Sequence, residues 1–434
     1  MSAITCTKGG RTLSRWVGAS AAVAAGLVIA SCSSSVPIAS PNLALPSTRS
    51  ASSSLAPSSV LPPAQNTAGS PAYVKALTSK IAKTLKQDAI PGAVVLVRSK
   101  EKGNWTAAFG TRQIGHNDPI SALDVFRLGD VTETMTATAI LRLQDQGKLR
   151  LSDPISKYVP GVPNGSRITL QQLGEYSSGL FSYDQDPSFR DRFLANPQRT
   201  WTPQELLDVS FAHPTLPPPA RDAYTNTNYI LLGLVIEKVT GTAAGTAFRT
   251  LLLDPLKLKR IGLSGASADL PGPHPRGYAF AHDPVGGATL PATQRSAAAA
   301  GTLKPVDRTM ENPSFAWTAG AAYSNASDLA DYFQAMVDGP LLSSATRAER
   351  ISEMEAMGAP DPDGVHYGYG IARFGPYLMY SGAVPGYHAL VAYDPSKKTT
   401  IVILTNLMWT PDGGAPVARI FAEVNIALGV RTKS

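Results

Sequence analysis

Residues 93–98 read AVVLVR, and residues 105–109 read WTAAF. The residues between them, KEKGN at 100–104, are charged or turn-forming, which is the pattern of a β-hairpin. Upstream, residues 73–87 place apolar side chains at helical spacing until a Pro-Gly pair ends the run. We therefore expect the folded part of the chain to begin with a helix and then two paired strands.

The far end of the chain mirrors this beginning. A helix is expected at about 416–427, after short strand candidates at 368–374, 377–380, 388–393 and 399–404. Residues from about 123 to 365 are mostly helix and loop. Strands at both ends, with helices between them, predict one sheet split by an inserted, mostly helical subdomain. We expect an α/β (α+β) fold in which terminal helices flank an antiparallel sheet.

The first 31 residues have the features of an export signal. They carry three cations and no acid, and residues 16–30 are apolar over a length typical of a signal-peptide core. The sequence then reads LVIASC at 27–32, which resembles the lipobox of bacterial lipoproteins. The resemblance implies cleavage before Cys32 and a lipid anchor on its sulfur. A plain secretory signal with an incidental cysteine is the alternative.

Residues 32–72 follow as a segment rich in Ser, Pro and Ala with a single charge, Arg49. This composition cannot bury enough surface to offset the entropy of ordering, so we expect a tether. The folded domain is then 73–430. We expect an exported protein that is held by its lipid on the outer face of the bacterial cell membrane.

The composition excludes several classes of function. Three of the seven net positive charges lie in the signal segment, and the rest are too dilute for a nucleic-acid surface. Both cysteines lie within the first 32 residues, so the domain has no thiol for a disulfide, a metal or a nucleophile. The six histidines form no H-x-H or H-E-x-x-H pattern. We therefore expect no metal, no cofactor and no nucleic-acid partner.

Short sequence blocks stand in order along the domain. They are Phe126-Arg127-Leu128-Gly129 through Asp153-Pro154, Ser178-Gly179-Leu180, Tyr224-Thr225-Asn226 through Gly241, Asp254-Pro255-Leu256, Tyr323-Ser324 through Ala330, and Ser381 through Tyr387. Together they resemble the serine beta-lactamase and penicillin-binding protein superfamily, in its class C beta-lactamase and D-Ala-D-Ala carboxypeptidase-like branch. The resemblance covers nearly all of 73–430 and implies a beta-lactamase/transpeptidase-like fold.

The resemblance also implies three catalytic motifs. In the family, a serine begins a buried helix and a lysine one turn later, in S-x-x-K, supplies the base. Here that motif reads Asp130-Val131-Thr132-Glu133, so acids replace both residues. The second motif, Tyr224-Thr225-Asn226, is intact, while the third reads Tyr380-Ser381-Gly382, with tyrosine where the family has lysine or histidine. Elsewhere in the domain, only Ser99 and Lys102 fit S-x-x-K, in the expected hairpin turn.

Two interpretations of the altered motif remain open. Asp130 followed by Glu133 forms a capping-box-like arrangement that stabilises a helix start. Alternatively, the two carboxyl groups form a pair in a pocket, where mutual repulsion raises one pKa and yields an acid and a base. Tyr224 and Asn226 also have two interpretations. Either they line that pocket, or they precede a core helix that ends at Gly241 and is capped by an asparagine.

The N-terminal segment predicts a cell-envelope lipoprotein. The altered first motif predicts that its beta-lactamase-like domain no longer acylates. Such a pseudoenzyme would bind a peptidoglycan-type peptide, a small ester or amide, or a partner protein. The alternative is an esterase- or peptidase-type hydrolase that uses the two acids with Tyr224. The expected site positions are Asp130, Glu133, Tyr224, Asn226, Tyr380 and Gly382, and Cys32 is the expected lipidation site.

Overall fold

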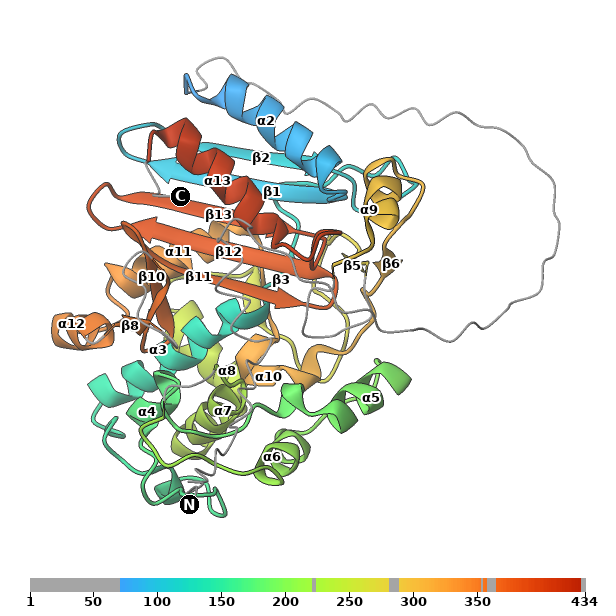
Figure 1. Ribbon diagram of the computed structural model, residues 1–434. Helices are drawn as coiled ribbons and strands as arrows, with labels where there is room; N and C mark the ends of the chain where they lie inside the picture. Colours follow the sequence, from blue (N-terminus) through green and yellow to red (C-terminus); the bar gives the residue numbers. More distant parts are fainter. Residues whose placement is uncertain (1–70, 221–223, 281–288, 353, 357–363, 431–434) are drawn as a thin grey trace, which may run out of the picture.

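The computed structural model of the protein describes residues 71–220, 224–280, 289–352, 354–356 and 364–430. The expected signal segment, Cys32 and almost all of the expected tether lie outside these residues. The described part is a sheet with helices on both of its faces (Figure 1).

The central sheet has eight strands in the order β2-β1-β13-β12-β11-β10-β9-β8, and neighbouring strands are antiparallel. Val95 in β1 lies opposite Ile403 in β13, so the two ends of the domain pair directly within the sheet. The predicted hairpin and the antiparallel sheet are confirmed. The strands are β1 (Gly92–Ser99), β2 (Trp105–Gly110), β8 (Glu355–Ala356), β9 (His366–Gly368), β10 (Ile371–Phe374), β11 (Tyr377–Val384), β12 (Tyr387–Asp394) and β13 (Thr399–Thr405).

One face of the sheet is covered by the terminal helices α2 (Val74–Gln87) and α13 (Pro416–Leu428) (Figure 1). The apolar stripe of α2 is fully buried, as its helical spacing predicts. Lys80 in α2 and Glu423 in α13 form an ion pair of 3.2 Å, which joins the two helices at their surface. The two ends of the domain therefore lie side by side.

The other face of the sheet carries the larger core, around α3 (Thr132–Asp145) and α7 (Thr227–Thr240). A short antiparallel sheet, β3-β7-β4, leads into α3. The remaining elements are β3 (Phe126–Arg127), η2 (Gly129–Val131), η3 (Ile155–Lys157), α4 (Leu170–Gly174), η4 (Tyr183–Gln185), α5 (Pro187–Ala195), α6 (Pro203–Phe211), α8 (Ala244–Phe248), η5 (Arg249–Leu253), β4 (Ile261–Leu263), β5 (Tyr278–Ala279), α9 (Ala292–Ala299), β6 (Val306–Asp307), η6 (Pro313–Phe315), α10 (Trp317–Gly320), β7 (Ala322–Ser324), α11 (Ala326–Val337) and α12 (Ser344–Ser352).

One predicted strand is wrong in detail. Residues 368–374 were expected to form a single strand, but the chain turns between β9 and β10 at Tyr369 and Gly370. Gly370 has a φ of +56°, and a Cβ there would overlap Ala137 of α3. The turn therefore needs a glycine both for its backbone angle and for its close contact with α3.

No single helix among the described residues has both the length and the apolar composition to cross a bilayer. Within this part of the chain, Thr227–Thr240 taken together with Ala244–Leu253 reaches both, and this pair is bent by 76°.

Candidate functional site

Two glycines bring the first and third motifs into contact. The 3-10 turn η2 packs against β11, and α3 follows directly from η2. Gly129 has a φ of +53°, and a Cβ on it would lie 2.6 Å from the backbone nitrogen of Ala383. A Cβ on Gly382 would lie 2.3 Å from the backbone nitrogen of Asp130. Because neither position has room for a side chain, the start of α3 lies directly against the third motif.

The carboxyl group of Glu133 lies at the centre of the site and is 0% exposed. The hydroxyl of Tyr224 lies 2.8 Å from its Oε1, and Tyr380 donates to its Oε2 at 2.5 Å. Tyr176 also bonds to Oε2, and its hydroxyl lies 2.5 Å from that of Tyr380. We call these four residues the Glu133 cluster. Burial is the largest cause that raises the pKa of Glu133 well above its ordinary value, and the charge of Asp130 adds to it.

The hydrogen bonds of Tyr224 indicate where the proton is. Its hydroxyl has one proton but contacts two acceptors, Glu133 Oε1 at 2.8 Å and Asn226 Oδ1 at 3.0 Å. The amide nitrogen of Asn226 donates to Asp184 at 2.9 Å, which directs the amide oxygen toward Tyr224. A proton on Glu133 Oε1 would satisfy both contacts, with Glu133 donating to Tyr224 and Tyr224 donating to Asn226. The raised pKa of Glu133 favours the same protonated form.

Asp130, the other acid of the first motif, is partly exposed. Its Oδ2 accepts a hydrogen bond of 3.2 Å from the backbone N–H of Ala383. Burial raises the pKa of Asp130 to about 7, although the N–H of Ala383 and the hydroxyl of Tyr224 lower it. Neither η2 nor α3 has a side-chain hydrogen bond at its N-cap. The capping interpretation is therefore wrong, because both carboxyl groups make their contacts across the site.

Asn226 of the second motif does not act as a cap either. It precedes α7 without a side-chain cap hydrogen bond, and its amide joins Tyr224 to Asp184 instead. Asp184 is buried, its oxygens are bound by Ser182 and Asn226, and burial is the main cause that raises its pKa. The predicted end of α7 at Gly241 is confirmed, with a φ of +68°. The second motif thus extends the chain of hydrogen bonds from Glu133 to a further acid.

Sequence reasoning missed two residues of this network, Tyr176 and Asp184. Tyr176 follows α4 with a φ of +56°, an unusual backbone conformation for a tyrosine, and its ring centroid lies 4.7 Å from that of Tyr224. The only signal in the sequence is their position beside the block that begins at Ser178. The strained backbone of Tyr176 supports a role in fixing the hydroxyl on Glu133.

A hydroxyl–imidazole pair beside the third motif was also missed. Ser381 Oγ lies 3.2 Å from Nε2 of His388, and Nδ1 of His388 lies 2.8 Å from the carbonyl oxygen of Met408. Ser381 is partly exposed, whereas His388 is buried, which lowers its pKa to about 4. The imidazole is therefore neutral near pH 7, with Nε2 as the acceptor.

The other sequence candidates do not form a second reactive centre. The hydroxyl of Ser99 lies 2.9 Å from that of Thr399 and accepts a hydrogen bond of 3.2 Å from the backbone N–H of Lys102. The ammonium of Lys102 pairs with Glu101 at 3.0 Å, so this coincidental S-x-x-K does not form a catalytic serine–lysine pair. Among the residues that the structure describes, no group of three His, Cys, Asp or Glu side chains is placed to hold a metal ion. The chemistry available at the site is that of two carboxyl groups and their tyrosine partners.

Comparisons with known proteins agree with the observed fold. The sequence profile of the Beta-lactamase family matches residues 77–424. PbpX of Bacillus subtilis (strain 168), provisionally named a penicillin-binding protein, is 25% identical over 347 residues, which cover 80% of this chain and 78% of PbpX. Teichoic acid D-alanine hydrolase of Staphylococcus aureus is 25% identical over 183 residues, or 42% of this chain and 43% of that protein.

A solved structure is similar over most of the domain. The D-stereospecific amidohydrolase from a Streptomyces species is 29% identical, with a TM-score of 0.67, and the match covers 80% of this chain and 98% of that chain. The fold class predicted from the terminal strands and helices is confirmed by this likeness. Because the family profile spans most of the sequence, the chain belongs to the Beta-lactamase family.

Proposed function

We propose that this protein is a non-acylating member of its family, exported as a lipoprotein, whose altered site binds a peptidoglycan-type peptide. The observation that carries the proposal is the Asp130 carboxyl group. It stands at the start of α3, where the family motif has its serine, and it accepts a hydrogen bond from the strand that carries the third motif.

The hydroxyl groups around position 130 support the loss of acyl transfer. An acyl-enzyme needs a free hydroxyl with a base beside it. Thr132 donates its hydroxyl proton to the carbonyl of Gly129 at 2.6 Å, and Thr134 donates to that of Val131 at 2.8 Å. Both threonines are fully buried. Burial raises the pKa of Glu133 and favours its protonated form, in which it is no base for either hydroxyl.

The charge of the site supports a ligand with an amino group. Position 133 carries an acid with a raised pKa in place of a lysine, and Asp130 is an acid with a pKa of about 7. An ammonium group beside Asp130 would favour its charged form and pair with it. The names of two relatives, D-stereospecific amidohydrolase and teichoic acid D-alanine hydrolase, support a D-amino-acyl group in the ligand. A peptidoglycan-type peptide with a free amine and D-alanine combines these features.

One observation favours a second candidate, a hydrolase that forms no covalent intermediate. Asp130 is partly exposed and has a pKa of about 7, which suits a general base that activates water. In this alternative, Tyr224 would stabilise the charge that develops on the substrate. The hydrogen bond from Ala383 opposes it, because the carboxylate then occupies a donor that could otherwise stabilise a substrate oxygen.

Binding and turnover measured on the same protein distinguish these candidates. The purified protein is tested for binding to a muropeptide that contains D-alanine by calorimetry, and for turnover of that muropeptide, a D-alanyl ester and a D-alanyl amide. We expect binding without turnover, and binding weakened by Asp130→Asn but unchanged by Asp191→Asn on the exposed surface of α5. Turnover that Asp130→Asn abolishes would establish the hydrolase instead. Absence of both binding and turnover would contradict both candidates.

Covalent labelling is a second test of the non-acylating proposal. We expect no label from fluorescent penicillin on the wild-type protein. A label mapped by peptide digestion to Thr132, Thr134 or Ser381 would contradict the non-acylating proposal. Ser381 is included because its hydroxyl contacts a neutral imidazole.

The lipid anchor is tested on the native protein. Mass spectrometry should find an N-terminal peptide that begins at Cys32 and carries a diacylglyceryl group. Replacing Cys32 with alanine should release the protein from the membrane fraction. An unmodified peptide that runs through Ser31-Cys32 would contradict the proposal.

A further inference from the structure

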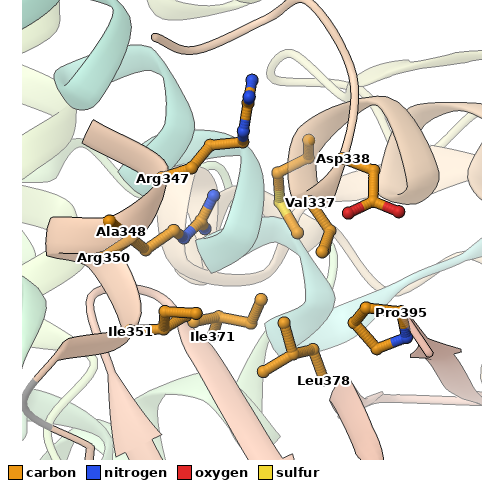
Figure 2. Close-up of a pocket in the computed structure, with 10 residues that line it drawn as sticks. Val337, Asp338, Arg347, Ala348, Arg350, Ile351, Ile371, Leu378 and Pro395 are labelled. Atoms are coloured by element: carbon orange, nitrogen blue, oxygen red, sulfur yellow. The ribbon is translucent and has the colours of Figure 1, made fainter. Parts of the chain in front are cut away.

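A separate cavity of about 170 Å³ lies between α11, α12 and the strands β10 and β11. Its walls are mainly apolar, with Ile351 from α12, Ile371 from β10 and Leu378 from β11 on one side (Figure 2). Figure 2 also shows Arg347 and Arg350 on the α12 side, opposite Val337 and Asp338. None of these residues belongs to the Glu133 cluster.

Arg350 is the unusual member of this lining. It is only 3% exposed, and its guanidinium donates to the carbonyls of Tyr369 at 2.9 Å and Gly370 at 2.8 Å and to the hydroxyl of Thr138 at 2.9 Å. All three acceptors are neutral. No carboxylate among the described residues forms an ion pair with Arg350. A buried guanidinium keeps its charge, so this cation lacks the anion that usually accompanies it.

The other charges at the cavity do not supply that anion. Asp338 is the one acid in its lining, and its Oδ2 is already bound by Lys398 at 2.6 Å and Tyr393 at 2.5 Å. Arg347 adds a second guanidinium, whose Nη1 donates to the carbonyls of Gly339 and Leu342 at 2.6 Å each. The cavity therefore combines an apolar interior with an excess of positive charge.

We propose that this cavity binds a small organic carboxylate, with its carboxylate toward Arg350 and Arg347 and its apolar part against Ile351, Ile371 and Leu378. The size sets the class of ligand. An apolar cavity of about 150 Å³ holds one benzene ring. The available 170 Å³ therefore fits a single ring or a chain of about six carbons. A guanidinium presents a planar pair of donors that matches a carboxylate.

The test uses benzoate and hexanoate as probes on the purified protein, with benzamide as the neutral analogue of benzoate. Calorimetry or ligand-detected NMR should show saturable binding of both carboxylates, at least tenfold tighter than benzamide. Ala348→Trp places a large ring in the cavity from an exposed position of α12 and should weaken benzoate binding at least tenfold. Ala345→Trp, also exposed on α12 but outside the cavity, is the matched control and should leave binding unchanged.

Three outcomes would overturn the proposal. Benzamide that binds as tightly as benzoate would show that the arginines do not select a carboxylate. Benzoate binding that Ala348→Trp leaves unchanged would place the ligand elsewhere. No detectable binding of either carboxylate at millimolar concentration would show that the cavity has no such ligand. Arg347→Gln is a second variant that leaves Arg350 and its buried contacts in place, and it should weaken benzoate binding but not benzamide binding.

Discussion

Glu133 is buried in α3 and Arg350 is buried against α3, and neither has a partner of opposite charge among the described residues. Three tyrosine hydroxyls surround Glu133, while two carbonyls and a threonine hydroxyl surround Arg350. The two groups differ in whether they can lose their charge. A carboxylate becomes neutral by taking up a proton, but a guanidinium cannot lose one near neutral pH. The region around Glu133 can therefore lose its buried charge by protonation, whereas the region around Arg350 keeps its charge.

The largest expected effect comes from placing a cation in the Glu133 cluster. The double substitution Asp130→Ser and Glu133→Lys restores a serine at the helix start with a lysine one turn later, and Tyr224 lies beside both positions. We expect labelling by fluorescent penicillin, or turnover of an ester, where the wild type shows none. Neither single substitution should be enough, because each supplies only the nucleophile or only the base.

This double variant must be shown to fold, for example by circular dichroism, before its activity is judged. A folded variant that remains inert to every ester and β-lactam would show that the substrate contacts of the family are gone. The chain would then be better described as a structural or protein-binding lipoprotein.

Asp130 should give the next largest effect, through the pH dependence of stability. Its pKa is about 7 in the folded protein and 3.8 ordinarily. A raised pKa means that the stability present below about pH 4 is lost as the pH rises through 7. Asp130→Asn removes this loss and should increase the free energy of unfolding above pH 7 by up to about 4 kcal/mol. Urea denaturation at pH 8 should show the gain, and at pH 4 it should be near zero. A gain that is equal at both pH values would contradict the raised pKa.

Removing the buried cation of Arg350 should lower the free energy of unfolding. Arg350→Met removes the guanidinium that donates to the carbonyls of Tyr369 and Gly370 and to the hydroxyl of Thr138. We expect a loss of about 3 kcal/mol in urea denaturation, because buried acceptors without donors are expensive. The matched control is Arg373→Met on the exposed surface of β10, which should change stability by less than about 0.5 kcal/mol. A similarly small change at Arg350 would mean that its contacts contribute little.

The smallest effect is expected from Glu133→Gln. Glutamine keeps one acceptor and one donor in nearly the same shape as the neutral acid, so the loss at pH 7 should stay below about 1 kcal/mol. The same urea denaturation series measures it. A loss as large as that of Arg350→Met would show that Glu133 is ionised, and the contrast between the two regions would fail.

Local patterns in the sequence were sufficient for most of the sheet and for the terminal helices. Alternation and helical spacing report on neighbours along the chain, and the strands at 93–98 and 399–404 and the helix at 73–87 follow from them. The pattern failed at 368–374, where one apolar run contains a turn. That turn depends on the contact between Gly370 and α3, which residues far apart in the sequence create.

The site was harder to predict for the same reason. The motif order pointed to Asp130, Glu133, Tyr224, Asn226, Tyr380 and Gly382, and the structure brings these positions together. The choice between a helix cap and a pair of acids depended on contacts from other elements. Tyr176 and Ala383 supply such contacts, and no local pattern distinguishes them. Burial and the resulting pKa shifts follow from tertiary packing alone.

The pairing of β1 with β13 affects when this chain can fold during its synthesis. The ribosome produces β1 early and β13 near the end, yet Ala93 must find Thr405 before the middle of the sheet can close. Such distant pairing gives a high contact order, so folding is slow, and the unpaired edge of β1 is open to aggregation meanwhile. Under the export that we propose, machinery that threads unfolded chains would receive a polypeptide that cannot close its sheet prematurely. Because β13 is the last strand to be made, the sheet stays incomplete until then. Truncation just before residue 399 should therefore leave the preceding residues unable to fold.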